Sequence, residues 1–346
     1  MKAIGYKHAG SLQLEHALQD ITLEMPQALG RDLLVKVAAI SVNPVDTKVR
    51  ASAQPTEGFK VLGWDAVGEV VATGSQSELF KVGDKVWYAG DLTRSGSNAE
   101  YQLVDERIVG RKPQSLSNAE AAATPLTAIT AWELLFDRLG FQITEAISKP
   151  ALNTSTDKPI LLIVGAAGGV GSILSQLAVN LTDAMVIGTA SRAKSQQWLT
   201  DLGVNHVINH HKDMKQQLKE LGIQEVSHVI SLTHTEQHFD GLVDVLAPQG
   251  KFALIDDPKE GLDIMKLKLK SISLHWEFMF TRSMFHTGDI IKQHKMLNTL
   301  ADLFDRKRLK TTLGENFGKI NATNLLKAHQ HIESNQAIGK IVLENF

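Results

Sequence analysis

A run of apolar residues leads into a glycine-rich turn at Pro159-Ile-Leu-Leu-Ile-Val-Gly165-Ala-Ala-Gly168-Gly169-Val-Gly171-Ser172. The run suits a buried strand, and residues 170–181 suit a helix. In such a unit Gly168 lets the backbone approach a pyrophosphate, and Gly171 lets the helix pack close to the strand. The N-terminus of the helix offers N–H groups and a positive dipole end to the phosphates. We therefore expect a dinucleotide-binding turn made by Ala166, Ala167, Gly168, Gly169, Val170 and Gly171.

The identity of the dinucleotide is indicated by the residues after the next expected strand, 185–188. An NAD site usually places an acid there to bind the ribose hydroxyls. No acid occurs between Asp183 and Asp201, whereas Ser191 and Arg192 could hold a 2′-phosphate. NADPH is therefore favoured over NADH. Because Ala166 replaces the first glycine of the usual G-x-G-x-x-G pattern, a purely structural turn remains the alternative to a dinucleotide site. For Arg192, the alternative is a solvent-exposed residue at the start of a helix.

Strands and helices alternate from this motif onward. The alternation predicts βαβ units and a parallel, doubly wound sheet. The first part of the chain, to about residue 125, instead shows short strands joined by turns and suggests a β-rich domain. The expected strands are 33–40, 66–72, a hairpin-like corner at 80–87, 160–164, 185–188, 206–208, 226–231 and 250–255. The expected helices are 126–139, 170–181, 193–202, 212–221 and 236–247; residues 146–158 are a polar loop.

The segment 271–280 alternates strictly, with Ile272, Leu274, Trp276, Phe278 and Phe280 on one face. We expect a strand late in the sheet and therefore at its edge. Its aromatic face would either pack under a helix or form the seam of a homodimer. Two helices near 290–304 and 322–334 and a strand at 338–344 should pack back against the first domain.

Composition excludes several classes of protein. A chain of 346 residues is long enough for two domains. The net charge of −2 gives no electrostatic reason to expect nucleic acid or an anionic membrane as partner. The absence of cysteine removes disulfides, thiol nucleophiles, iron–sulfur clusters and thiolate zinc sites together.

Targeting signals are not evident. The first eight residues, Met1-Lys-Ala-Ile-Gly-Tyr-Lys-His8, lack the apolar run of a signal peptide. Residues 159–182 carry no charge and are long enough to span a membrane, but glycines and polar residues interrupt them. A buried strand entering a helix explains this stretch better. We expect a cytoplasmic protein without a membrane partner.

Several motifs in this order resemble the medium-chain dehydrogenase/reductase superfamily, in its quinone oxidoreductase-like branch. They are residues 41–50 (SVNPVDTKVR), 61–69 (VLGWDAVGE), 82–86 (VGDKV), 125–128 (PLTA), 166–171 (AAGGVG) and 339–343 (GKIVL). The resemblance implies a Rossmann domain at 126–279 inserted into a GroES-like catalytic domain formed by 1–125 and 280–346. The run 274–282 further resembles a subgroup called zinc-type alcohol dehydrogenase-like.

Zinc ligands of that subgroup do not match. In zinc-dependent relatives a Cys, a Gly-His-Glu and a second Cys supply the catalytic ligands. The corresponding positions hold Asn43, Gly63-Trp64-Asp65 and Pro125, and the four-cysteine structural lobe is missing. One carboxylate does not make a zinc site. The paired histidines of the chain lack a third ligand at a recognisable spacing, so we expect no metal.

The resemblance implies that Asn43 and Asp46 lie by the nicotinamide and that Thr127 lies near the cofactor or substrate. Asn43 could donate a hydrogen bond to a developing oxyanion. Asp46 could orient its neighbours or only cap a helix. We expect Trp64 to be either a wall of the substrate pocket or a core residue. We also expect Lys340 to be one of the residues that bind the cofactor.

Without a metal, hydride transfer is easiest to an acceptor that delocalises the developing charge itself. We therefore expect an NADPH-dependent reductase of a small-molecule quinone, activated enone or other carbonyl compound. The alternatives are a zinc-type alcohol dehydrogenase-like enzyme, an enoyl-thioester reductase, or an NADPH-binding protein with little turnover.

Overall fold

The computed structural model describes residues 1–144 and 158–346, which form two compact units. The first unit consists of Met1–Ile129 and Met279–Phe346, and the second unit of Thr130–Phe278. The second unit thus interrupts the first in the sequence. Each unit is described by itself below.

The second unit is built on a six-stranded sheet in the order β11-β10-β9-β12-β13-β14, and all neighbouring strands are parallel. The chain runs outward from the central β9 to β11 and then returns to the other side of β9 through β12. This confirms the predicted doubly wound parallel sheet. The strands are β9 (Ile160–Val164), β10 (Met185–Thr189), β11 (His206–Ile208), β12 (Val226–Ser231), β13 (Leu246–Leu254) and β14 (Ser273–Trp276).

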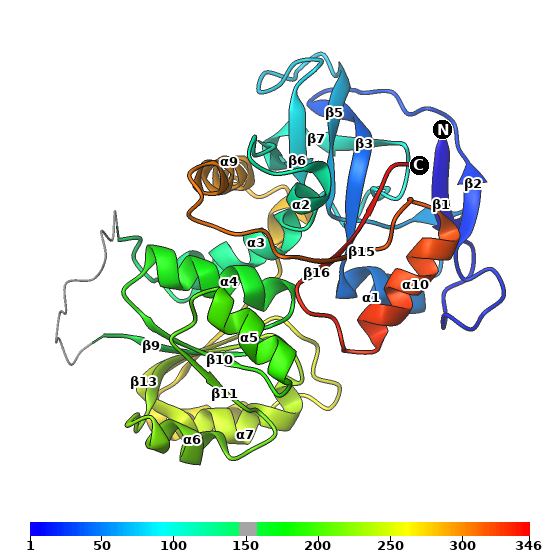
Figure 1. Cartoon of the computed structure of the whole chain (residues 1–346). Coiled ribbons are helices and arrows are strands. Elements are labelled where there is room, and N and C mark those ends of the chain that lie inside the picture. The colour runs from blue at the N-terminus through cyan, green and yellow to red at the C-terminus, as the bar shows by residue number, and fades with distance from the viewer. Residues whose placement is uncertain (145–157) are drawn as a thin grey trace. The chain divides into compact units, whose positions relative to one another are not determined.

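Helices cover both faces of this sheet. Figure 1 shows α4 and α5 over one face and α6 and α7 over the other. Burial from both sides explains why β9 is a continuous apolar run. The helices are α4 (Gly169–Leu181), α5 (Ala193–Asp201), α6 (Met214–Glu220), α7 (Thr235–Val245) and the 3-10 helix η3 (Ile264–Lys270).

The first unit contains two sheets. One has the order β2-β1-β4; the other has the order β15-β16-β3-β5-β6-β8, with β7 also pairing with β3. The long β3 pairs with β5 on one edge and with β16, from the end of the chain, on the other. The strands are β1 (Lys2–Tyr6), β2 (Gln19–Thr22), β3 (Asp32–Val42), β4 (Lys60–Val61), β5 (Ala66–Thr73), β6 (Lys85–Tyr88), β7 (Tyr101–Asp105), β8 (Val109–Arg111), β15 (Leu313–Asn316) and β16 (Lys340–Glu344).

Helices of the first unit come from both ends of the chain. The predicted return of the tail is observed, because α9 contacts β8 and α10 contacts α1. Figure 1 shows α10 beside α1. The helices are α1 (Pro44–Ser52), η1 (Glu106–Ile108), α2 (Asn118–Ala122), α8 (Thr281–Met284), α9 (Ile291–Asp305) and α10 (Ala322–Glu333). The predicted helix 126–139 is α3 (Pro125–Trp132) followed by a π-helical segment, η2 (Glu133–Arg138).

Two of the predicted strand segments are longer than the strands in the structure. The predicted strand 271–280 is at the edge of its sheet, but as β14 it covers only residues 273–276. Its last aromatic residue, Phe280, belongs to the first unit, where its ring packs edge-on against Trp64. At 80–87 only the second arm is a strand, because residues 81–84 turn at Gly83, whose φ is +96°.

The predicted loop 146–158 lies outside the described residues except for Lys158. No helix of residues 1–144 and 158–346 is long and apolar enough to cross a membrane. The uncharged run that raised this question divides into β9 and α4, and α4 has 13 residues.

Candidate active site

The glycine turn of the second unit joins β9 to α4. Gly165 has a φ of +78°, a conformation that favours glycine, and its N–H donates to Thr189 Oγ1 at 3.2 Å. A Cβ on Gly171 would overlap the backbone of Ala166, so only glycine lets α4 approach the end of β9 this closely. A Cβ on Gly168 would meet nothing nearer than Gly165 O at 3.5 Å. Internal packing therefore requires Gly171, whereas a Cβ at Gly168 would make only an ordinary van der Waals contact.

Helix N-termini at the carboxyl edge of the sheet differ in their caps. Asp213 accepts a hydrogen bond from Gln216 N in α6, and Asp256 accepts one from Thr235 N at the start of α7. Among the described residues no side chain caps α4, which begins after Gly168, or α5, which begins after Arg192. These two starts keep N–H groups that an anion can bind.

The predicted specificity residues lie at the start of α5. Arg192 occupies the N-cap position and is exposed, and Ser191 is half-buried beside it. Trp198 Nε1 in α5 donates to Ser172 Oγ in α4 at 2.9 Å and so ties the two helices together. The structure thus brings the turn at 166–171 and the pair at 191–192 to the same edge of one sheet.

A second group of polar residues is buried in the first unit, where β5, β3 and β16 lie side by side. Asn43 follows β3, Asp65 precedes β5, and Lys340 opens β16. The register pairs Ile40 with Ala66 and Val42 with Ile341, so these three residues meet although they are far apart in the sequence.

These three side chains form one hydrogen-bonded network. Lys340 Nζ donates to Asn43 Oδ1 at 2.5 Å and to Val42 O at 3.0 Å, and it lies 3.2 Å from Asp65 Oδ2. Asn43 Nδ2 donates to Asp65 Oδ2 at 2.8 Å and points to Ser41 O at 3.4 Å. The amide hydrogens of Asn43 are thus directed inward, which leaves the predicted oxyanion contact without a donor from this side chain in this conformation.

Asp65 also fixes the helix that carries Thr127. Asp65 Oδ1 accepts a hydrogen bond from Leu126 N at 2.7 Å, and a carboxylate is favourable at the start of a helix. Thr127 Oγ1 donates to Thr124 O at 3.0 Å, and Thr127 is buried. The network therefore reaches α3.

Asp46 holds the start of α1 to the same group. Asp46 Oδ2 accepts a hydrogen bond from the backbone N–H of Asn43 at 2.7 Å, as the capping interpretation predicts. Asp46 Oδ1 has no hydrogen-bond partner among the described residues. Burial raises the pKa of Asp46 to about 7, a change that Lys340 partly opposes.

Burial also governs the ion pair of the network. It raises the pKa of Asp65 and lowers the pKa of Lys340, and the attraction between the two groups opposes both shifts. For each of the two charged groups, the opposite charge of the other is thus the main compensation for the cost of burial.

Trp64 lies in the core of the first unit. It is fully buried, and Trp64 Nε1 donates to Asp91 O at 3.1 Å. These contacts match the interpretation of Trp64 as a core residue.

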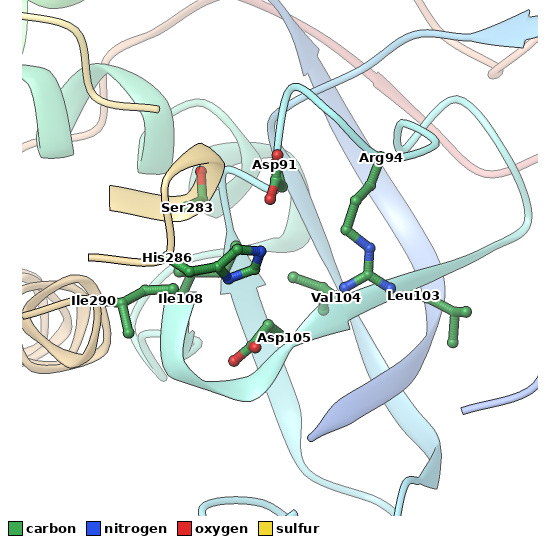
Figure 2. A pocket seen from close by; sticks show the side chains of 9 residues that line it. All are labelled: Asp91, Arg94, Leu103, Val104, Asp105, Ile108, Ser283, His286 and Ile290. Carbon is green, nitrogen blue, oxygen red and sulfur yellow. The ribbon is translucent and has the colours of Figure 1, made fainter. Parts of the chain in front are cut away.

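Two cavities of the first unit contain none of the predicted site residues. The smaller has a volume of about 20 Å³, room for about one water molecule. Figure 2 shows the His286 ring between the carboxylates of Asp91 and Asp105. A recess of about 370 Å³ lies beside β1 and β2. The smaller cavity is lined by Asp91, Arg94, Leu103, Val104, Asp105, Ile108, Ser283, His286 and Ile290.

Comparison with known proteins agrees with this architecture. Residues 30–114 match the family model "Alcohol dehydrogenase GroES-like domain", and residues 202–343 match "Zinc-binding dehydrogenase". The chain is 38% identical to a zinc-type alcohol dehydrogenase-like protein of Staphylococcus epidermidis over 344 residues, 99% of either protein.

Solved structures share the fold over the whole chain. A candidate zinc-dependent alcohol dehydrogenase of Rhizobium etli CFN 42 is 49% identical, with a TM-score of 0.94 over 100% of this chain and 98% of its own. Escherichia coli quinone oxidoreductase, solved with NADPH, is 24% identical, with a TM-score of 0.81 over 99% of this chain and 100% of its own.

A Rossmann unit interrupting a β-rich, GroES-like unit defines a class of oxidoreductases. The chain belongs to the medium-chain dehydrogenase/reductase superfamily, as its motifs indicated.

Sequence reasoning did not anticipate how Lys340, Asn43 and Asp65 contact one another. No spacing signals the contact, because it depends on the pairing of β16 with β3. The cap of α7 by Asp256 was missed for the same reason, since it joins the ends of two neighbouring strands.

Proposed function

We propose that this protein is an NADPH-dependent reductase that transfers hydride to a quinone or an activated enone without zinc. The proposal depends on one observation, namely that the ammonium group of Lys340 lies 3.2 Å from the Asp65 carboxylate. Asp65 is the one acidic side chain at the positions that supply zinc ligands in relatives. A cation beside it and an amide in place of a thiolate do not fit a zinc ion.

Among the described residues, no three His, Cys, Asp or Glu side chains are grouped so that they could hold a metal ion. A reaction that relies on protein groups alone is easiest with a substrate that spreads the developing charge over its own conjugated system. The names of two relatives fit this class. One is the E. coli quinone oxidoreductase, and the other is the 2-methylene-furan-3-one reductase of Solanum lycopersicum, 28% identical over 99% of this chain and 79% of its own.

The second unit supports NADPH as the cofactor. The uncapped start of α4 and the lack of a side chain at Gly168 suit a pyrophosphate, and the uncapped start of α5 with Ser191 and Arg192 suits a 2′-phosphate. A mycobacterial relative solved with NADPH is 26% identical, with a TM-score of 0.80 over 99% of either chain. Bound NADPH would supply the hydride, and solvent would supply the proton that completes reduction of the acceptor.

Residues of the first unit then have positioning roles. Asn43 and Asp65 hold the end of β3 and the start of α3 in one arrangement, and Asp46 holds the start of α1. Such a fixed polar group costs no reorganisation during the reaction.

The proposal is tested by following NADPH consumption at 340 nm with EDTA-treated protein. An ortho-quinone, an enone and a simple aldehyde are offered separately. Turnover of the quinone or enone without metal supports the proposal. Activity that appears only with aldehyde and added zinc contradicts it and favours an alcohol dehydrogenase.

A second candidate is an NADPH-binding protein with little turnover. The observation that favours it is the burial of all four predicted catalytic residues, Asn43, Asp46, Trp64 and Thr127, each of which is at most 2% exposed. NADPH binding without consumption with any of the three acceptors would select this candidate.

We also propose a homodimer formed through β14. This strand ends the sheet order, and exposed apolar side chains lie on and beside it: Leu269, Trp276 and Phe278. An exposed edge strand with an apolar surface favours pairing with a second copy about a two-fold axis.

A further inference from the structure

Lys340 is a cationic side chain enclosed within the first unit. Only 4% of it is exposed, although lysine is rarely buried. Its three ammonium hydrogens have three acceptors: Val42 O, Asn43 Oδ1 and Asp65 Oδ2. The donor capacity of Lys340 is therefore used inside the unit that contains it.

The contact with Lys340 determines which way the Asn43 amide faces. With Oδ1 on the ammonium group, Nδ2 donates to Asp65. Rotation of the amide by 180° would place its NH₂ group against the Lys340 ammonium and its oxygen against the Asp65 carboxylate. Both contacts would be repulsive, so the ion pair permits one orientation.

This orientation is connected to the other polar residues of the site. The backbone N–H of Asn43 donates to Asp46, and Asp65 accepts from Leu126 N at the start of α3. A change at the Lys340 ammonium would therefore reach the starts of both α1 and α3.

We propose that Lys340 is a positioning residue for the reaction and not a ligand of a cofactor phosphate. Its ammonium group fixes the Asn43 carboxamide and, with it, the Asp65 and Asp46 carboxyl groups. The proposal rests on the proposed function, because it assigns a role within that reductase site.

A phosphate contact would require Lys340 to leave this network. Asp65 would then keep a buried carboxylate without its cation, which is strongly unfavourable. Arg192 in the second unit is exposed and lies at the start of α5, where the proposed 2′-phosphate contact belongs.

The decisive variant is Lys340→Met, which removes the charge and keeps a long unbranched side chain. We expect the NADPH dissociation constant, measured by fluorescence titration, to stay within about twofold of the wild type. We expect kcat with the quinone at saturating NADPH to fall roughly 100-fold, because small misplacements of reacting groups have effects of this size. The pKa of the Asp46 carboxyl group, followed by NMR titration, should move to higher pH, since the Lys340 cation that lowered it is gone.

Two further variants serve as controls for Lys340→Met. Arg192→Met should weaken NADPH binding roughly tenfold, as expected for loss of a charged contact. Lys319→Met, at an exposed lysine of the first unit, should change neither quantity. A tenfold weaker NADPH affinity in Lys340→Met, or an unchanged kcat, would overturn the proposal.

The double variant Lys340→Met/Asp65→Asn covers the case in which the single variant does not fold. Each single change leaves one charge buried alone, whereas the double change removes both. The double variant should therefore have a higher melting temperature than either single variant. A purely additive loss of stability would contradict the coupling of the two charges. This cycle and the NADPH titration need no acceptor, so they decide the role of Lys340 even if the wild type turns over none.

Discussion

Asp46 combines a helix cap with a buried carboxyl oxygen that has no hydrogen-bond partner among the described residues. One carboxyl oxygen holds the start of α1 through Asn43 N, and the other has no partner among the described residues. Burial raises the pKa of this group to about 7 from an ordinary value near 3.8. The folded protein therefore keeps a proton on Asp46 over a pH range in which the unfolded chain has lost it.

Asp46→Asn should consequently change the pH dependence of stability. Because the folded pKa is raised, the wild type loses stability as pH rises from about 4 to about 7, with a limiting slope of about 1.4 kcal/mol per pH unit. The variant keeps a cap acceptor without the charge and should lack this loss. Urea unfolding at pH 5 and pH 8 measures the difference, with Asp183→Asn at an exposed position as control. Parallel pH profiles for wild type and Asp46→Asn would contradict the expectation.

Two glycines of the proposed dinucleotide-binding turn should separate NADPH binding from folding. Gly171→Ala places a methyl group on the backbone of Ala166 and should cost about 1–3 kcal/mol of unfolding free energy. Gly168→Ala makes only an ordinary contact with Gly165 O at 3.5 Å and has an allowed φ of −75°, so it should cost less stability and weaken NADPH binding roughly tenfold. Thermal unfolding and NADPH titration of both variants measure this. Equal affinities of Gly168→Ala and wild type would leave the turn without its proposed ligand.

At the scale of elements, the contact between α1 and α10 includes a buried histidine. His329 in α10 is fully buried, and neither ring nitrogen has a hydrogen-bond partner among the described residues. Burial, together with the smaller effect of the positive charge on nearby Arg50 in α1, lowers its pKa to about 3. The helix pair therefore depends on a neutral imidazole.

His329→Phe should make the protein more resistant to acid. The pKa of His329 in the folded protein lies below its unfolded value near 6.5. The wild type therefore has its full unfolding free energy above pH 6.5 and loses part of it as pH falls toward 3. The limiting loss is about 1.4 kcal/mol per pH unit. Unfolding measured at pH 7 and pH 4.5 should show a smaller loss for His329→Phe than for wild type. His8→Gln, at an exposed site, is the control and should follow the wild type.

The local sequence specifies most elements of the second unit. The apolar run 160–164 becomes β9 with the predicted bounds, because a strand buried on both faces needs an unbroken apolar sequence. The alternation at 271–280 was less informative: it predicts a strand, but Trp276 is its last residue and Phe280 packs in the first unit. The periodicity of apolar residues does not indicate in which of the two units an apolar side chain will be buried.

At the scale of the whole molecule, the proposed dimer can be tested through β14. Trp276→Lys places a charge on the exposed edge and should convert a dimer into a monomer, as measured by light scattering after gel filtration. Phe285→Lys is the matched control, because Phe285 is 72% exposed but belongs to the first unit. A monomeric wild type at micromolar concentration would contradict the dimer.

The sequence by itself determined the parallel sheet and predicted a dinucleotide-binding turn, and its resemblance to the superfamily implied the insertion of one unit into the other. The sheet and the turn follow from local runs, in which the spacing of apolar residues and glycines is itself the physical cause. Only the tertiary structure decided the contacts of the polar site. Lys340 meets Asn43 and Asp65 because β16 pairs with β3 and β3 pairs with β5. Strand pairing between distant segments follows from the packing of the complete unit, so no local pattern could show that Asn43 directs its amide inward.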